Sequence, residues 1–192
     1  MKSSQNSIYS PEKLIELFCV SDKKEDAALV KKAITFALEN RIIKDRLPYS
    51  IEVALILRNF DVDQTTLLAA ILSDRDFINS LTDSTLTEEY GETLMTLITS
   101  VRWLNTFRNC ENGEASKPSV PEQAERLRRM LLAMVDDVRA VLIKLAWRLY
   151  HLRILDKSSY IKRHCVAQET LDIFAPLANR LGISQMKWEL ED

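Results

Sequence analysis

The sequence predicts an all-α fold, and its composition and periodicity both support that prediction. Only three glycines and five prolines occur in 192 residues, while straight-chain helix formers such as leucine, glutamate, lysine and arginine are abundant. Apolar residues recur at helical spacing along most of the chain, and no segment alternates persuasively in the manner of a strand. The length fits one good-sized domain, with or without a short extension.

Helix-starting residues divide the first half of the chain into short helices. We expect these starts at Ser10 followed by Pro11, at Tyr49 or Ser50 after the break at Pro48, at Asp63, and at Thr85 or Thr87. A helical period also covers residues 22–40, and Gly91 is expected to separate a short helix from a longer one.

The second half begins with a polar stretch, residues 108–123, that is rich in turn formers and predicts a surface loop. Residues 122–155 give the strongest helical pattern, with a polar face or a junction at Asp136 and Asp137. A further helix is expected to be kinked or ended by Pro176 and to stop at Gly182, and a last helix follows from residue 183.

Composition and motifs exclude several classes of function. The net charge of −2 gives no broad electrostatic attraction to nucleic acid or to an anionic membrane. Three scattered cysteines fit free thiols in a reducing, cytoplasmic compartment, and no apolar run is long enough to cross a membrane. His151 and His164 are the only histidines, and neither a nucleophile elbow nor a glycine-rich phosphate loop occurs.

Two long segments, Arg128–Leu155 and Glu169–Asp192, closely resemble the amino-terminal region of the RelA/SpoT family, which makes and degrades (p)ppGpp. The patterns "LLAMVDD…VLIKLA" and "APLANRLGISQMKWELED" are the most specific parts of the resemblance. It implies an HD-domain-like multi-helix bundle over residues 1–180. Residues 181–192 would then begin a connecting helix toward a synthetase domain beyond this chain.

In that family the bundle is a manganese-dependent hydrolase that removes pyrophosphate from the 3′ position of (p)ppGpp. Its metal ligands are a histidine, a His-Asp pair and a later aspartate, and a Glu-Asp pair helps to activate water. The resemblance places the metal-ligand positions on Tyr49, Ser73, Asp74 and Trp147, and the acid pair on Phe77 and Ile78. Only the Asp74 carboxylate is retained, so we expect neither catalytic residues nor a manganese cofactor.

The resemblance is therefore sharpest to the RelA branch, in which the hydrolase domain is inactive and the whole protein is a GTP pyrophosphokinase of the stringent response. It implies that this bacterial, cytoplasmic chain is not itself an enzyme and regulates the synthetase domain of the same protein. The parent would transfer pyrophosphate from ATP to GTP or GDP. Missing carboxy-terminal regions would contact the ribosome and uncharged tRNA.

Two alternatives remain open at this point. The remnant pocket could bind ppGpp or GDP as an allosteric ligand, with contacts from Arg41, Arg128, Arg129 and Arg153. A residual hydrolase could instead use Asp74, Asp76 and either Asp136 or Asp137 with altered metal chemistry, although these acids do not occupy matching positions.

Overall fold

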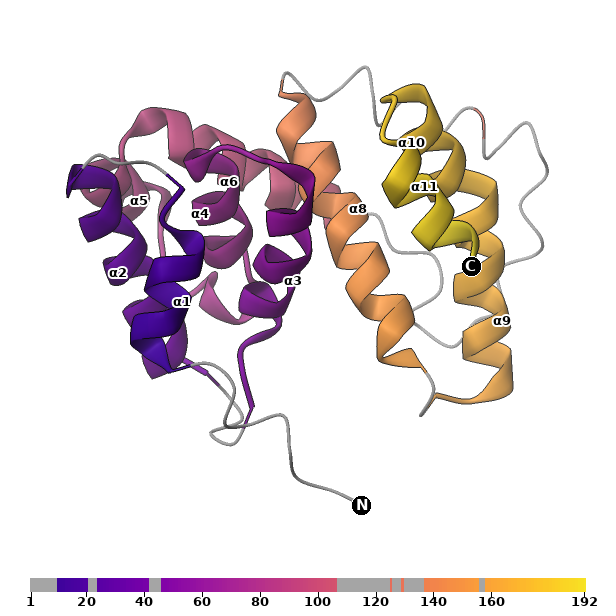
Figure 1. Cartoon of the computed structure of the whole chain (residues 1–192), viewed down its shortest axis with the longest axis horizontal. Helices are drawn as coiled ribbons and strands as arrows, with labels where there is room; N and C mark the ends of the chain where they lie inside the picture. Colours follow the sequence, from indigo (N-terminus) through magenta and orange to yellow (C-terminus); the bar gives the residue numbers. More distant parts are fainter. Residues whose placement is uncertain are drawn as a thin grey trace. The chain divides into compact units, whose positions relative to one another are not determined.

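The computed structural model describes residues 10–20, 24–41, 46–106, 125, 129, 137–155 and 158–192. Every regular element in these residues is helical, which confirms the all-α prediction (Figure 1). The chain divides into two compact units, Met1–Arg102 and Trp103–Asp192. Over the same described ranges, no helix combines the length and apolar character that crossing a membrane requires.

The first unit surrounds helix α4, whose residues from Thr66 to Leu72 are all buried. This helix is apolar on every side, which explains its central position, and it packs against both α2 and α3. The elements are α1 (Pro11–Phe18), α2 (Lys24–Glu39), α3 (Tyr49–Leu57), the 3-10 turn η1 (Arg58–Phe60), α4 (Gln64–Leu72), the 3-10 turn η2 (Arg75–Phe77), α5 (Asp83–Tyr90) and α6 (Glu92–Leu104).

Side-chain caps fix the starts of these helices. The Ser10 hydroxyl accepts a hydrogen bond from the backbone N–H of Lys13, and the Asp63 carboxylate accepts one from Thr66 at 2.8 Å. Both predicted caps are confirmed, as is the helix start at Tyr49.

The predicted cap of α5 is wrong, because this helix begins one turn earlier than expected. Thr82 is the capping residue, and its hydroxyl accepts from the backbone N–H of Thr85. A capping side chain bonds the third residue of its helix, so Thr85 is the donor at that position. Gly91 ends α5 with a φ of 88°, a backbone conformation that favours glycine. It separates the short helix α5 from the longer α6, as the sequence predicted.

The second unit is organised around α8 (Val138–Arg153), which contacts both the α9–α10 segment and the last helix. Asp137 caps α8, which agrees with the predicted junction at the paired acids. The predicted loop at residues 108–123 lies outside the described residues. The remaining elements are α9 (Tyr160–Glu169), the π-helical turn η4 (Thr170–Phe174), α10 (Ala175–Arg180) and α11 (Ser184–Glu191).

The π-helical turn η4 marks the position where Pro176 disturbs an otherwise continuous helix. Proline has no N–H to donate, and its ring clashes with the carbonyl four residues earlier, so the preceding turn widens. The Ala175 N–H accordingly donates to the Thr170 carbonyl, five residues back. The expected kink at Pro176 thus takes the form of a π turn.

Two arginine–glutamate pairs tie α8 to its neighbours within the second unit. Arg148 donates to Glu169 at the end of α9, and both side chains are about nine-tenths buried. The Arg148 guanidinium also lies 4.0 Å from the centre of the Phe174 ring. Arg153 donates to Glu189 of α11 at 2.8 Å, at an exposed position.

The expectation of free thiols is met by Cys19 but not by Cys165. Cys19 is a free, half-buried cysteine of the first unit. Cys165, on α9, is disulfide-bonded. Widely spaced cysteines give no sequence pattern from which such a bond can be predicted.

Candidate functional site

A cavity of about 250 Å³ opens in the first unit, where the segment before α3 meets the segment after α4. Three of the sequence-predicted vestigial positions, Tyr49, Asp74 and Phe77, line it together. The full lining consists of Arg41, Arg46, Leu47, Pro48, Tyr49, Asp74, Asp76 and Phe77. The cavity therefore combines two guanidinium groups, two carboxylates and two aromatic rings.

Asp74 is the most constrained group of the cavity, with only 5% of its surface exposed. It follows α4 directly, and its two carboxylate oxygens accept different backbone hydrogen bonds. One oxygen accepts from Ser50 in the first turn of α3 at 3.3 Å, and the other accepts from Asp76 at 3.2 Å. Asp74 thus connects the end of α4 to the start of α3, where a negative charge is favourable.

Burial raises the pKa of the Asp74 carboxyl above its ordinary value of 3.8, and the nearby charge of Asp76 acts in the same direction. The backbone hydrogen bonds from Asp76 and Ser50 oppose this change without cancelling it. The charged form is therefore less favourable in the folded chain than in water.

The raised pKa predicts a specific pH dependence of stability. As pH rises through the window from 3.8 to the raised pKa, the unfolded chain releases the Asp74 proton first, so the free energy of unfolding falls. Asp74→Asn removes this titration. We expect the stability difference, wild type minus variant, to be largest below pH 3.8 and to fall across that window.

Urea unfolding at a series of pH values measures this difference, and Asp61→Asn on the exposed surface is the matched control. A difference between wild type and Asp74→Asn that does not change with pH would contradict the assignment.

Two other vestigial positions near Asp74, Ser73 and Phe77, are occupied by structural contacts. Ser73 is 1% exposed, and its hydroxyl donates to the Ala70 carbonyl of α4 at 3.2 Å. Phe77 is also 1% exposed and meets the Phe36 ring edge-on, with the ring centres 5.3 Å apart. Ile78, in contrast, is 45% exposed and does not line the cavity.

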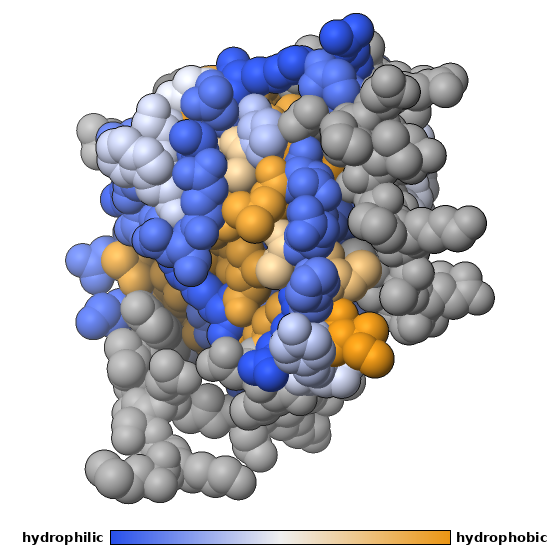
Figure 2. Space-filling view, turned by 90° about the vertical axis from the view of Figure 1, so that its right-hand side faces the viewer, coloured by the Kyte–Doolittle hydropathy of each residue, from blue (hydrophilic) through white to orange (hydrophobic). Residues whose placement is uncertain are grey.

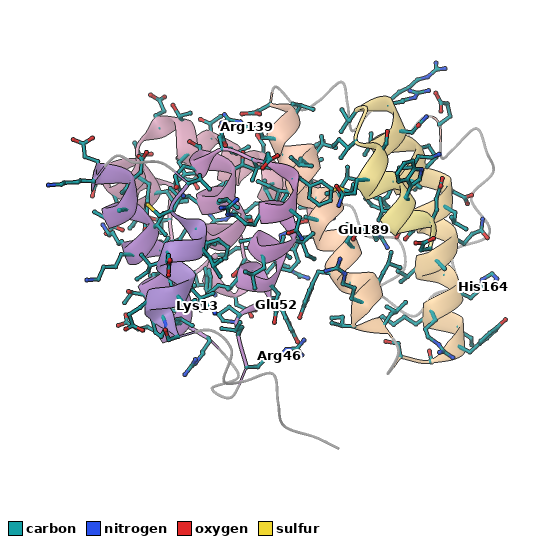
Figure 3. All side chains as sticks on the ribbon, in the orientation of Figure 1. Lys13, Arg46, Glu52, Arg139, His164 and Glu189 are labelled. Carbon is teal, nitrogen blue, oxygen red and sulfur yellow. The ribbon has the colours of Figure 1, made fainter. Side chains whose placement is uncertain are left out.

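The basic side of the cavity is formed by the ends of the α2–α3 connection. Arg41 follows α2, and Arg46 lies just before α3 (Figure 3). The Arg46 guanidinium lies 4.9 Å from the centre of the Tyr49 ring, in a cation–π arrangement. The sequence analysis named Arg41 as a possible nucleotide contact but did not name Arg46. Both arginines lie shortly before Pro48, and this shared position could have indicated that Arg46 belongs to the same site.

The other residues singled out from the sequence lie in the second unit. Trp147, on α8, is half-buried and contacts Tyr150 edge-on at 6.4 Å between ring centres. Arg129 and Arg153 already bond to the carboxylates of Glu125 and Glu189. Arg128 lies outside the described residues. The placement of these residues beside Asp74 stays a prediction from the resemblance.

The cavity does not fit a manganese ion. Hydrolytic metal sites need several carboxylate or imidazole donors, yet the positions near the cavity where the resemblance implies metal ligands hold a phenol, a buried hydroxyl and one carboxylate. Both Asp74 oxygens already accept backbone N–H groups. Nowhere in the described ranges do three histidine, cysteine or acidic side chains gather at metal-binding distances.

The sequence of the chain is similar to a known domain family and to several known proteins. Residues 28–184 match the family model described as an HD domain. A GTP pyrophosphokinase of Myxococcus xanthus is 39% identical over 173 residues, covering 87% of the chain and 22% of that relative. A GTP pyrophosphokinase of Escherichia coli K12 is 43% identical over 142 residues, covering 74% of the chain and 19% of the relative.

A relative whose name includes a hydrolase activity is also similar. The bifunctional (p)ppGpp synthase/hydrolase SpoT of Escherichia coli K12 is 37% identical over 146 residues, covering 76% of the chain and 20% of that protein. The chain thus spans about a fifth of the length of the curated relatives it matches.

Proposed function

Because the chain belongs to the HD domain family and, through that domain, to the RelA/SpoT family, we propose that it is a catalytically inactive hydrolase-like domain. In this proposal it is the amino-terminal domain of a cytoplasmic GTP pyrophosphokinase and regulates the synthetase domain of the same protein. Ribosome and uncharged tRNA would act through other regions of that protein.

One observation carries the proposal: the Asp74 carboxylate serves as a backbone acceptor between α4 and α3, and among the described residues it belongs to no group of three potential metal-binding side chains. The neighbouring positions support the same conclusion. Ser73 bonds to its own helix, and Phe77 packs into the core where the resemblance implies a catalytic carboxylate. The helical frame is thus kept while the hydrolytic groups are replaced.

We expect the purified chain to release no pyrophosphate from ppGpp in the presence of manganese, beyond the rate without protein. A single retained ligand cannot hold a divalent cation that lowers the pKa of water. The measurement is pyrophosphate release at several manganese concentrations, with the SpoT relative as the positive control. Turnover clearly above the protein-free rate would refute the inactive assignment.

A second candidate function is binding of a guanine nucleotide such as ppGpp or GDP, without hydrolysis, in the same cavity. The observation in its favour is that the cavity stays open and is lined by Arg41 and Arg46. Guanidinium groups suit phosphate oxygens because they donate two parallel hydrogen bonds.

Calorimetry with ppGpp tests this second candidate. Arg46→Ala is expected to weaken binding by roughly tenfold or more, which is the size of one charged hydrogen-bonded contact. Lys13→Ala, an exposed change on α1 outside the cavity lining, is the matched control. No heat at high protein concentration would exclude nucleotide binding and leave the regulatory proposal standing.

A further inference from the structure

Two opposite charges in the cavity of the first unit have no partner of their own. The Arg41 guanidinium and the Asp76 carboxylate both line the cavity, and within the described part of the chain neither group forms a hydrogen bond or an ion pair. In the second unit, by contrast, the space-filling view shows an apolar strip bordered by rows of polar side chains (Figure 2). Apolar surface distinguishes poorly between partners, whereas a few placed polar groups in a cavity define the chemistry of a ligand.

The backbone around Asp76 is fixed, although its side chain is exposed. The Asp76 N–H donates to a carboxylate oxygen of Asp74 at 3.2 Å, and the Phe77 N–H donates to the Asp74 carbonyl at 3.1 Å. Phe77 is buried and packs against Phe36. Asp76 therefore lies between two constrained residues, so a ligand that binds its carboxylate does not have to order the backbone of this turn.

Of the two carboxylates in the lining, that of Asp76 is the one available to a ligand. Both oxygens of Asp74 already accept backbone N–H groups, and only 5% of the Asp74 surface is exposed. An ionised carboxylate accepts hydrogen bonds but donates none, so the part of a ligand that faces Asp76 must carry donors. The arginines of the lining require an anionic part in the same ligand.

A guanine nucleotide, the ligand of the second candidate function, meets both requirements. Its phosphates suit the arginines, and its base carries two adjacent donors, the N1–H and the 2-amino group. These two donors match the two oxygens of one carboxylate. Adenine instead places an acceptor, its N1, beside a single amino group, and hypoxanthine keeps the N1–H but lacks the 2-amino group.

We propose that Asp76 recognises the base of a guanine nucleotide in the cavity, with its two carboxylate oxygens accepting from the N1–H and the 2-amino group while Arg41 and Arg46 bind the phosphates. Asp76 is then the residue that selects guanine over adenine and hypoxanthine. This role rests on the second candidate function, nucleotide binding without hydrolysis, and adds base specificity to it.

Calorimetry of the purified chain with GDP, inosine diphosphate (IDP) and ADP tests the base specificity. IDP differs from GDP only in the missing 2-amino group, and it should bind roughly tenfold or more weakly, which is the size of one hydrogen bond to a charged group. ADP should bind at least as weakly as IDP, because the lone pair of its N1 would face the carboxylate. These comparisons use the wild-type chain and do not depend on the folding of a variant.

Asp76→Asn separates hydrogen bonding from charge. Loss of a negative charge should by itself strengthen binding of an anionic nucleotide, yet the new amide turns a donor toward the 2-amino group of GDP. We therefore expect at least about tenfold weaker GDP binding. Xanthosine diphosphate carries an oxygen at position 2 that accepts from an amide, so the variant should prefer it to GDP.

Two further variants serve as controls. Asp61→Asn removes an exposed carboxylate outside the cavity lining and should leave the preference for GDP over IDP unchanged. Arg41→Ala should weaken GDP and IDP by the same factor, because the arginine acts on the phosphates that the two nucleotides share. Circular dichroism and thermal unfolding verify that each variant is folded.

The possible failures are distinguishable. Equal affinities for GDP and IDP, or a preference for GDP that survives Asp76→Asn, would overturn the role of Asp76 and leave nucleotide binding in the cavity standing. No heat with any of the nucleotides at high protein concentration would overturn both. The inactive hydrolase-like assignment does not depend on either result.

Discussion

Phe77→Glu should lower the free energy of unfolding of the first unit by at least about 3 kcal/mol, even though the resemblance implies a carboxylate at this position in active relatives. The side chain is 1% exposed and packs edge-on against Phe36. Removing a buried phenyl ring alone costs about 3–5 kcal/mol, and a buried carboxylate without a partner adds a desolvation cost.

The adjacent residue supplies the control for this prediction. Ile78→Asp places an acid at the second position of the pair that the resemblance implies, but Ile78 is 45% exposed, so the change should stay within about 0.5 kcal/mol. Urea unfolding followed by circular dichroism measures both variants. Equal stability of Phe77→Glu and wild type would show that this position is still accessible to water, against the packing described.

The second large effect is expected in the other unit. Arg148→Ala should destabilise it by about 3–5 kcal/mol, because it leaves the buried Glu169 carboxylate without its charged partner. The substitution also removes the cation–π contact with Phe174. Both members of the Arg148–Glu169 pair are about nine-tenths buried, so water cannot replace the lost hydrogen bonds.

Arg153→Ala is the matched comparison on the same helix. It breaks a pair with Glu189 whose side chains are 54% and 33% exposed, and such pairs contribute at most about 1 kcal/mol. Chemical denaturation of the two variants under the same conditions gives the difference. Similar losses for Arg148→Ala and Arg153→Ala would contradict the role of burial in this argument.

Local chemistry made part of the fold predictable from the sequence. Ser10 and Asp63 were identifiable as caps because their oxygens serve backbone N–H groups three residues later, a purely local relation. Thr82 was missed because several threonines stand close together there, and spacing alone does not decide which begins α5. The π turn before Pro176 depends on how backbone hydrogen bonds rearrange around a proline.

The candidate site was predictable only through the resemblance. Tyr49 and Asp74 are 25 residues apart in sequence, and no periodicity would bring them together around one cavity. The structure does so through the packing of α3 on α4. Arg46 was missed because its position follows from the path of the chain before Pro48, which the helical pattern does not describe.

The packing of Phe77 has an evolutionary consequence. If ancestors of this chain had a carboxylate there, its loss allowed the ring of Phe36 to gain an edge-on neighbour in the core. A reversal at this single position would now pass through a destabilised protein, without restoring activity until the other ligands also returned. Selection would remove such intermediates, so if hydrolysis was lost as we propose, the packing of Phe77 would oppose its return.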